Sequence, residues 1–284
     1  MLESLETVRI AILADNLVTD GKGCLGEHGL SLFVEADGAC FLFDVGQSGI
    51  AVGNAARLGC DLSSAETVVV SHGHYDHAGA LPMLLQAFGP RKLLAHPDLF
   101  TPKYVRRRGR GPRAIGLPFS AADLAALGAE AHFSLSTEAQ PICPGASTTG
   151  VIPQTDDFEA IPSHFAIQTS RGLRRDDFAH EQAALLRTSR GLVVLVGCSH
   201  RGVVNTIRRA MDLTGIDRVA AVVGGLHLGA APDDQVSATI EELRRLNIAH
   251  VVACHCTGFG PSAKLAAALG DAFRPGGVGF SLTL

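Results

Sequence analysis

The feature that most constrains this chain is a cluster of four potential metal ligands within six residues, directly after a β-branched run at positions 67–70. The cluster reads Ser71-His72-Gly73-His74-Tyr75-Asp76-His77. Its first two imidazoles point the same way in extended backbone, whereas Asp76 and His77 come where the chain turns toward a helix. Imidazole and carboxylate ligands suit zinc, iron or manganese. One loop at the end of a strand is therefore predicted to supply parts of two adjacent metal sites.

Strand and helix patterns alternate on both sides of this loop. The first half predicts strands at 8–14, 30–35, 40–44, 67–70 and 92–95, with helices over 48–58 and 78–88. The second half predicts strands at 192–196, 218–223, 250–253 and 278–282, with helices over 203–211, 233–243 and 262–269. Because the halves share this rhythm and the first begins with a hairpin, we expect a sheet sandwich covered by helices rather than one open sheet.

Residues 98–180 separate the two halves and are rich in Pro, Gly and Ser. A stretch of this kind predicts an irregular, lid-like insertion, here within a single domain of residues 1–284. It contains a basic run without an acid, formed by Lys103, Arg106, Arg107, Arg108, Arg110 and Arg113. A solvated loop is the favoured interpretation of this run, and an anion clamp is the alternative.

Composition and charge argue against several classes of protein. The 284 residues carry 24 Lys and Arg against 28 Asp and Glu, a net charge of −4, which argues against general nucleic-acid binding. No apolar run approaches the roughly 18 residues that span a bilayer, so no membrane association is expected. The first twenty residues lack a basic start followed by a long apolar stretch, and the seven cysteines are an odd number. We therefore expect a cytoplasmic protein with reduced thiols.

The histidine cluster matches His-x-His-x-Asp-His, and in this respect the chain resembles the metallo-β-lactamase-fold hydrolase superfamily. The resemblance implies a four-layer αββα sandwich of the α/β class. It also implies that Gly197-Cys198-Ser199-His200 and Cys254-His255-Cys256, which follow later strands, supply the remaining ligands. On this basis His72, His74 and His200 surround one ion, and Asp76, His77 and His255 surround the other. One or two divalent ions are expected, with zinc first and iron or manganese as alternatives.

One departure from the superfamily pattern concerns the carboxylate that usually bridges the two metals. The corresponding strand end reads Val222-Val223-Gly224-Gly225-Leu226-His227 and has no carboxylate. His227 could contact substrate, bind a metal or be structural, and substrate contact ranks first. The cysteines at 198, 254 and 256 are interpreted as packing thiols, since residues next to His255 in a strand would point away from it. Cys198 is the strongest exception, because it shares a face with His200 in extended backbone.

Further segments resemble the dihydropterin-6-yl-methyl-4-(ribofuranosyl)aminobenzene 5′-phosphate synthase family. These segments are Glu27-His28-Gly29-Leu30-Ser31, Asp44-Val45-Gly46-Gln47-Ser48, Gly197-Cys198-Ser199-His200-Arg201-Gly202, Gly224-Gly225-Leu226-His227-Leu228 and His255-Cys256-Thr257-Gly258. The resemblance implies substrate contacts at His227, Thr257 and Gly258. It leaves the substrate open, because the branch is broad.

The leading interpretation is a metal-dependent hydrolase of this fold that acts on a small anionic substrate, phosphorylated or pterin-like, through metal-activated water. Asp76 would then also act in catalysis by orienting that water or accepting its proton. The first alternative is a transferase that joins a pterin-methyl diphosphate to an aminobenzene ribotide and releases diphosphate. The second alternative is a non-catalytic metal or ligand sensor on the same fold.

Overall fold

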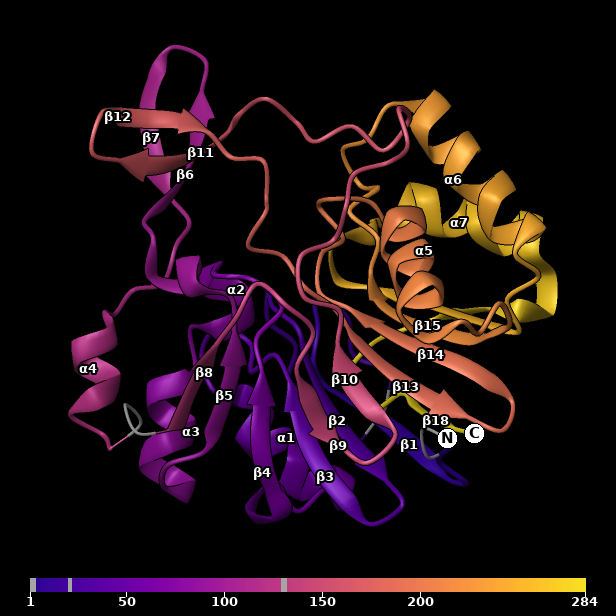
Figure 1. Cartoon of the computed structure of the whole chain (residues 1–284), viewed down its shortest axis with the longest axis horizontal. Coiled ribbons are helices and arrows are strands. Elements are labelled where there is room, and N and C mark those ends of the chain that lie inside the picture. The colour runs from indigo at the N-terminus through magenta and orange to yellow at the C-terminus, as the bar shows by residue number, and fades with distance from the viewer. Residues whose placement is uncertain (1–3, 20–21, 129–131) are drawn as a thin grey trace.

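Two seven-stranded sheets pack face to face at the centre of the molecule (Figure 1). The computed structural model describes residues 4–19, 22–128 and 132–284. The first sheet has the order β18 (Ser281–Thr283), β1 (Val8–Ala14), β2 (Ser31–Ala36), β3 (Ala39–Phe43), β4 (Ala65–Val69), β5 (Lys92–Ala95) and β8 (Phe133–Leu135). The second has the order β17 (Phe273–Pro275), β16 (His250–Cys254), β15 (Val219–Gly225), β14 (Gly191–Val196), β13 (Ala184–Thr188), β10 (Ala146–Thr148) and β9 (Pro141–Cys143).

Helices cover the outer face of each sheet. The first sheet is covered by α1 (Ile50–Leu58) and α3 (Leu81–Phe88), with α4 (Ala121–Ala125) at its edge. The second is covered by α5 (Val203–Thr214), α6 (Asp233–Arg245) and α7 (Phe259–Leu269). This is the expected four-layer αββα sandwich. Within the described ranges, no helix combines the length and the apolar character needed to cross a membrane.

Strand patterning explains why both sheets are buried on two sides. In β1, Ile10 and Ile12 pack between the sheets, whereas Ala11 and Leu13 pack against the helices of the first half. Successive side chains of a strand point to opposite faces, so a strand that is apolar at every position is buried on both. Strand β14 has the same character, since all six of its residues are buried.

The insertion at residues 98–180 is more regular than expected. It forms a separate four-stranded sheet in the order β12 (Gly172–Arg175), β11 (Phe165–Thr169), β6 (Lys103–Arg107) and β7 (Arg110–Ala114). It also supplies β8, β9 and β10 to the two large sheets. The prediction of an irregular segment is therefore wrong for the described part, while residues 129–131 lie outside it. Short hairpins punctuated by Gly and Pro lack the long periodicity on which sequence patterns depend. Its lid-like role stays a prediction, as does the single domain.

Parallel pairing places the candidate ligands at one edge of the sandwich. Strands β3, β4 and β5 run parallel in the first sheet, as do β14, β15 and β16 in the second. The carboxyl ends of these strands meet at the edge over which the four-stranded sheet stands (Figure 1). The short helix α2 (Tyr75–Ala78) begins at this edge, directly after the histidine loop.

Candidate metal centre

His72, His74 and His200, called the first trio below, meet at this edge from the loop after β4 and the turn after β14. One ring nitrogen from each lies within 4.8 Å of the other two, and Nε2 of His72 is 3.0 Å from Nδ1 of His74. Burial lowers the pKa of each imidazole well below its usual 6.5, so all three are neutral. Among the described residues, Nε2 of His74 and both ring nitrogens of His200 have no hydrogen-bond partner. Neutral, buried imidazoles with free nitrogens are suited to bind a cation.

Asp76, His77 and His255, called the second trio, lie beside the first. Nε2 of His255 is 3.2 Å from Nε2 of His77 and 3.4 Å from Oδ2 of Asp76. The remaining separation, from Nε2 of His77 to Oδ2 of Asp76, is 3.9 Å. Burial lowers the pKa of His77, but the charges of Asp44 and Asp76 outweigh burial and raise it to about 9. The surrounding carboxylates thus stabilise a positive charge at this position, which a proton or a metal ion can supply.

Outer partners orient both imidazoles of the second trio. Nδ1 of His77 lies 2.7 Å from Oδ2 of Asp44, and Nδ1 of His255 lies 3.0 Å from Oδ1 of Asn16. The backbone N–H of His255 also donates to Oδ2 of Asp15, at 2.7 Å. A partner on one ring nitrogen leaves the other available for a metal, the usual arrangement at such sites.

The cysteines do not all pack as expected. Cys254 does, because its side chain is buried in the core between the sheets. Sγ of Cys198 lies 3.1 Å from Nε2 of His77, and ligand atoms of Cys198, His255 and Cys256 all lie within 4.8 Å of one another. The expectation that Cys256 points away from His255 is therefore wrong. Residues 255–257 form a 3₁₀ turn, and His255 has a left-handed φ of 51°, so the alternation of a strand does not apply.

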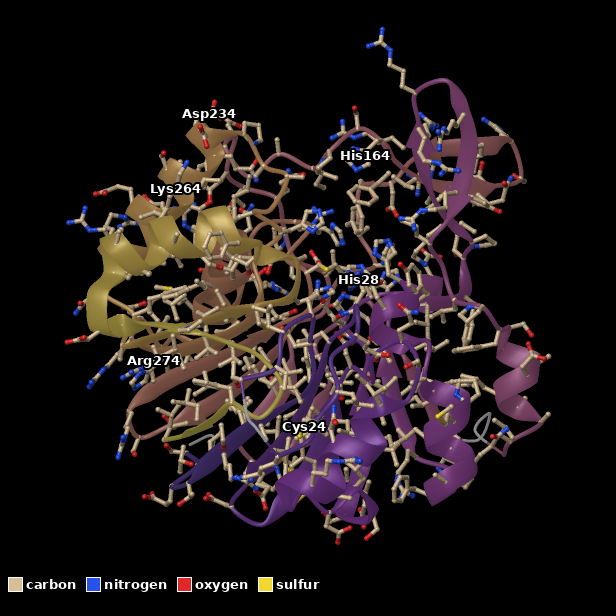
Figure 2. All side chains as sticks on the ribbon, turned by 180° about the vertical axis from the view of Figure 1, so that it is seen from behind. Cys24, His28, His164, Asp234, Lys264 and Arg274 are labelled. Carbon is tan, nitrogen blue, oxygen red and sulfur yellow. The ribbon has the colours of Figure 1, made fainter. Side chains whose placement is uncertain are left out.

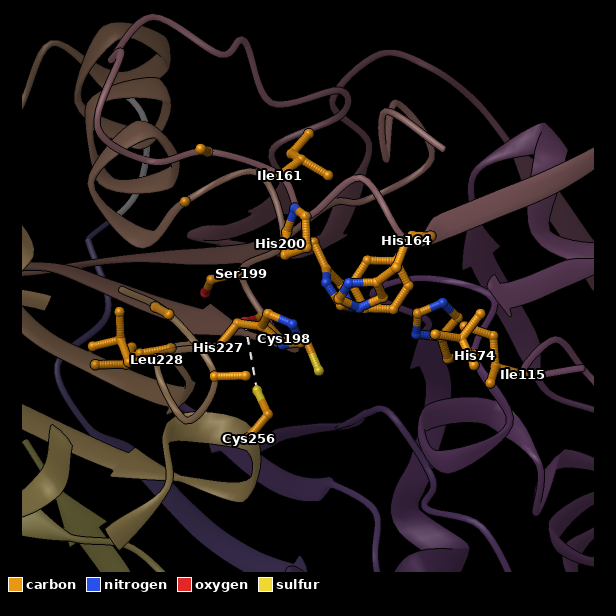
Figure 3. Close-up of a pocket in the computed structure, with 18 of the residues that line it drawn as sticks. His74, Ile115, Ile161, His164, Cys198, Ser199, His200, His227, Leu228 and Cys256 are labelled. Carbon is orange, nitrogen blue, oxygen red and sulfur yellow. Dashed lines mark hydrogen bonds between the residues drawn. The ribbon is translucent and has the colours of Figure 1, made fainter. Parts of the chain in front are cut away.

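A cavity of about 610 Å³ opens onto both trios. Its wall includes His74, Asp76, His200 and His255 together with the apolar side chains Tyr75, Ile115, Ile161 and Phe165 (Figure 3). Seen from behind, His28 lies near the middle of the molecule and His164 above it, toward the four-stranded sheet (Figure 2). Both line the cavity, as does Arg113 of β7. The site is a metal-ligand cluster beneath a partly apolar pocket.

The three predicted substrate contacts have different positions. His227 lines the cavity, with its ring centroid 4.2 Å from that of His200. Thr257 and Gly258 line a different cavity of about 510 Å³ behind the 255–257 turn. The Thr257 hydroxyl donates to the carbonyl of Cys254 and accepts the N–H of Leu226, so it stabilises the turn. The structure thus brings His227 to the site, but not Thr257 or Gly258.

Three residues in or directly after the insertion hold His200 or the turn that follows it, and sequence patterns do not predict them. Phe178 stacks on His200 with ring centroids 3.9 Å apart and an interplanar angle of 19°. Glu181 accepts the backbone N–H groups of His200 and Arg201, at 2.8 and 2.7 Å. Glu159 accepts those of Val204 and Asn205, at the start of α5. No periodic pattern accompanies these residues in the sequence, which is why pattern analysis misses them.

The profile of the metallo-β-lactamase superfamily matches residues 25–157, which contain the first histidine cluster, and the αββα sandwich is its fold. The chain is therefore similar to the metallo-β-lactamase superfamily over these residues and shares its fold. This fold implies divalent metal binding, and the groups of His and Asp side chains described above are candidates for it.

This chain is similar to two archaeal proteins and to one protein of known structure. A 7,8-dihydropterin-6-methyl-4-(β-D-ribofuranosyl)-aminobenzene-5′-phosphate synthase of Methanocaldococcus jannaschii is 26% identical over 264 residues, covering 90% of this chain and 89% of that protein. An uncharacterized protein of the same archaeon is 28% identical over 257 residues, covering 90% and 93%. The crystal structure of Tm1679, a metal-dependent hydrolase of the β-lactamase superfamily, is 28% identical and covers 97% of this chain and 98% of that one, with a TM-score of 0.82.

Proposed function

We propose that this metallo-β-lactamase-fold protein is a metal-dependent enzyme that acts on a small anionic molecule. In this proposal the first trio holds one divalent ion and the second trio the other, with zinc first among the candidate metals. The observation that carries the proposal is the convergence of six imidazole and carboxylate side chains beside one cavity. Two of them, His74 and His200, have ring nitrogens that lack any partner among the described residues.

The chemistry of the donor set fits such ions. Divalent ions held there would supply Lewis acidity toward a carbonyl or phosphoryl oxygen and make water more acidic. Burial raises the pKa of Asp76, but the charge of His77 and hydrogen bonds from His255 and His28 prevail and hold it well below 3.8. A carboxylate that stays ionised is a good ligand and can orient a water molecule by accepting its hydrogen bond. We therefore favour the orienting role of Asp76 over that of proton acceptor.

Arg113, on the four-stranded sheet, supports an anionic substrate. Strand pairing places Arg113, at the cavity, opposite Val105, and Arg107 opposite Arg110 further out. Arg107 and Arg110 are exposed and do not line the cavity, so the solvated-loop interpretation stays the favoured one for them. The anion-binding role is proposed for Arg113.

Lys103 does not share this role. Its side chain is buried, and Nζ donates to the carbonyls of Asp98, Leu99 and Thr101 at 2.9 to 3.2 Å. It stabilises the base of the four-stranded sheet, so the basic run of the sequence divides into one structural lysine and a set of exposed arginines.

Hydrolysis is the leading reaction, because the similar structure at 28% identity and a TM-score of 0.82 is described as a metal-dependent hydrolase. Transfer of a pterin-methyl group from its diphosphate to an aminobenzene ribotide is the second candidate. It is supported by the 26% identity to a synthase of the related compound over 89% of that protein. A cavity of about 610 Å³ with aromatic walls has room for a fused ring and a phosphate group.

The test offers the purified, metal-loaded protein two sets of substrates. One is a panel of phosphate esters in water, and the other is a pterin-methyl diphosphate with and without an aminobenzene ribotide. Release of phosphate or diphosphate in water alone would identify a hydrolase, and diphosphate release that needs the amine would identify the transferase. Turnover should disappear in His74→Ala and persist in His132→Ala, a matched control outside the cavity. Full metal occupancy with no turnover on either set would contradict the proposal and favour the sensor.

A further inference from the structure

We propose that the thiolate of Cys198 bridges the two ion positions and takes the place of the carboxylate that this chain lacks. The inference rests on the metal centre of the proposed function and concerns one more ligand in it. It makes the centre a thiolate-bridged pair of ions.

The position of the Cys198 sulfur carries this inference. Its Sγ is 3.1 Å from Nε2 of His77, which belongs to the second trio. It also lies within 4.8 Å of ligand nitrogens of His72 and His200, which belong to the first. Of the five groups that could hold a metal among the described residues, three contain Cys198. One sulfur is thus close to ligand atoms of both trios.

The local backbone directs Cys198 toward the ligands. The preceding Gly197 approaches the histidine loop so closely that a β-carbon there would lie 2.2 Å from Oγ of Ser71. The following Ser199 has a left-handed φ of 59°, and its hydroxyl donates to the carbonyl of Gly225 at 2.8 Å. A strand end held between Ser71 and Gly225 presents the side chain of Cys198 at the junction of the two sheets (Figure 3).

No carboxylate competes for this position among the described residues. In the groups that could hold a metal, Asp76 supplies the one carboxylate. The nearby Asp44 is already engaged, because its Oδ2 meets Nδ1 of His77 at 2.7 Å and accepts the Ser71 hydroxyl at 2.6 Å. Asp76 is the one carboxylate among the six ligands of the two trios, so an anion between two adjacent cations would stabilise them further, and the Cys198 thiolate is placed to be that anion.

Formation of the bridge requires the thiolate form of Cys198. The Cys198 thiol releases its proton to solvent, and two lone pairs of the resulting thiolate bind one ion each. Thiolate is a soft ligand and favours zinc over manganese, with zinc–sulfur distances of about 2.3 Å. A Cys198 thiolate ligand therefore favours zinc over manganese at this centre.

The test measures metal content and the zinc-edge X-ray absorption spectrum of the whole protein. The wild type should hold two zinc ions per chain, with sulfur at about 2.3 Å from zinc. Cys198→Ser should lose the sulfur shell and about one of the two ions, whereas Cys198→Asp should keep both ions without sulfur. Cys254→Ser is the matched control, since Cys254 is buried between the sheets. Its metal content and its zinc-edge spectrum should equal those of the wild type.

Two results would overturn the inference while leaving the proposed function intact. The first is two zinc ions without a sulfur shell in the wild type. The second is a sulfur shell that survives in Cys198→Ser and disappears in Cys256→Ser, which would make Cys256 the sulfur ligand. A wild-type protein that binds no ion would overturn the proposed function as well. Circular dichroism of Cys198→Asp, the variant expected to keep both ions, separates ligand loss from misfolding.

Discussion

The first and second trios lie side by side but are held by different forces. In the second trio, Asp44 and Asn16 each engage the outer nitrogen of an imidazole. In the first, the Ser71 hydroxyl contacts Nδ1 of His72 at 2.9 Å, while both ring nitrogens of His200 lack a partner among the described residues. His200 is held by Phe178 stacking and by Glu181 on its backbone. Hydrogen bonds therefore orient both imidazoles of the second trio, whereas ring stacking and a backbone contact position His200 in the first.

Removing one imidazole from each trio should have the largest effect. His200→Ala and His255→Ala should each lose one ion and reduce turnover by more than the roughly 10- to 100-fold that loss of an outer partner costs. Metal analysis alongside kinetics checks this. If both variants retained the wild-type metal content, the assignment of these histidines as ligands would be wrong.

A pH series should reveal the ionisation of Glu159, the buried carboxylate that contacts the start of α5. Burial raises the pKa of Glu159 from 4.5 to about 7. The folded protein then binds more protons than the unfolded chain between these values, so stability falls as pH rises through that window. The loss should reach at most about 3 kcal/mol, at 1.36 kcal/mol per pKa unit.

Denaturant titrations from pH 4 to 8 on the wild type and Glu159→Gln provide the check. The difference between their free energies of unfolding should change across this range and level off on either side. A constant difference would show that the ionisation of Glu159 is not linked to folding.

Loss of an outer partner should affect the second trio more than the first. Asp44→Asn should lower the affinity for one ion by about 10- to 100-fold, because an outer carboxylate fixes both the tautomer and the orientation of His77. Ser71→Ala should weaken binding less, since a hydroxyl is a weaker orienting group than a carboxylate. Its small effect should reach both trios, because the Ser71 hydroxyl contacts His72 and also donates to Asp44. Competition with a chromophoric chelator measures both affinities, with Asp61→Asn on the exposed surface as control. Equal effects of Asp44→Asn and Ser71→Ala would remove the distinction between the trios.

A smaller effect is expected from replacing Phe178, the aromatic residue that stacks on His200. Phe178→Leu keeps an apolar side chain but removes the ring that stacks on His200, and should cost about 1 kcal/mol of stability. The same chelator titration should show weaker binding at one site and unchanged binding at the other. Weakening at both sites would mean that Phe178 supports the whole centre rather than the first trio.

Sequence patterns predict the parts of the molecule that depend on the order of residue types over short stretches of the chain. The His72–His77 run and the ends of β14 and β16 were found because ligand-rich turns follow apolar strands, and the expected sandwich follows from the same strands. The positions of Cys256 and His255 cannot be predicted from strand alternation, because a left-handed His255 leaves no trace in the residue types. Sequence patterns place Lys103 in a basic run but do not show its structural role, nor that of Phe178, because their partners come from contacts that only the folded insertion creates. Long-range packing, rather than composition, determines those positions.

The most direct test of the two-trio metal centre is the number of metal ions per chain in protein purified without chelator. We expect two ions, falling to one in both His200→Ala and His255→Ala. A protein that binds no ion, even after reconstitution with zinc, iron or manganese, would contradict the metal centre itself. A single ion that persists unchanged in His255→Ala would contradict the second trio.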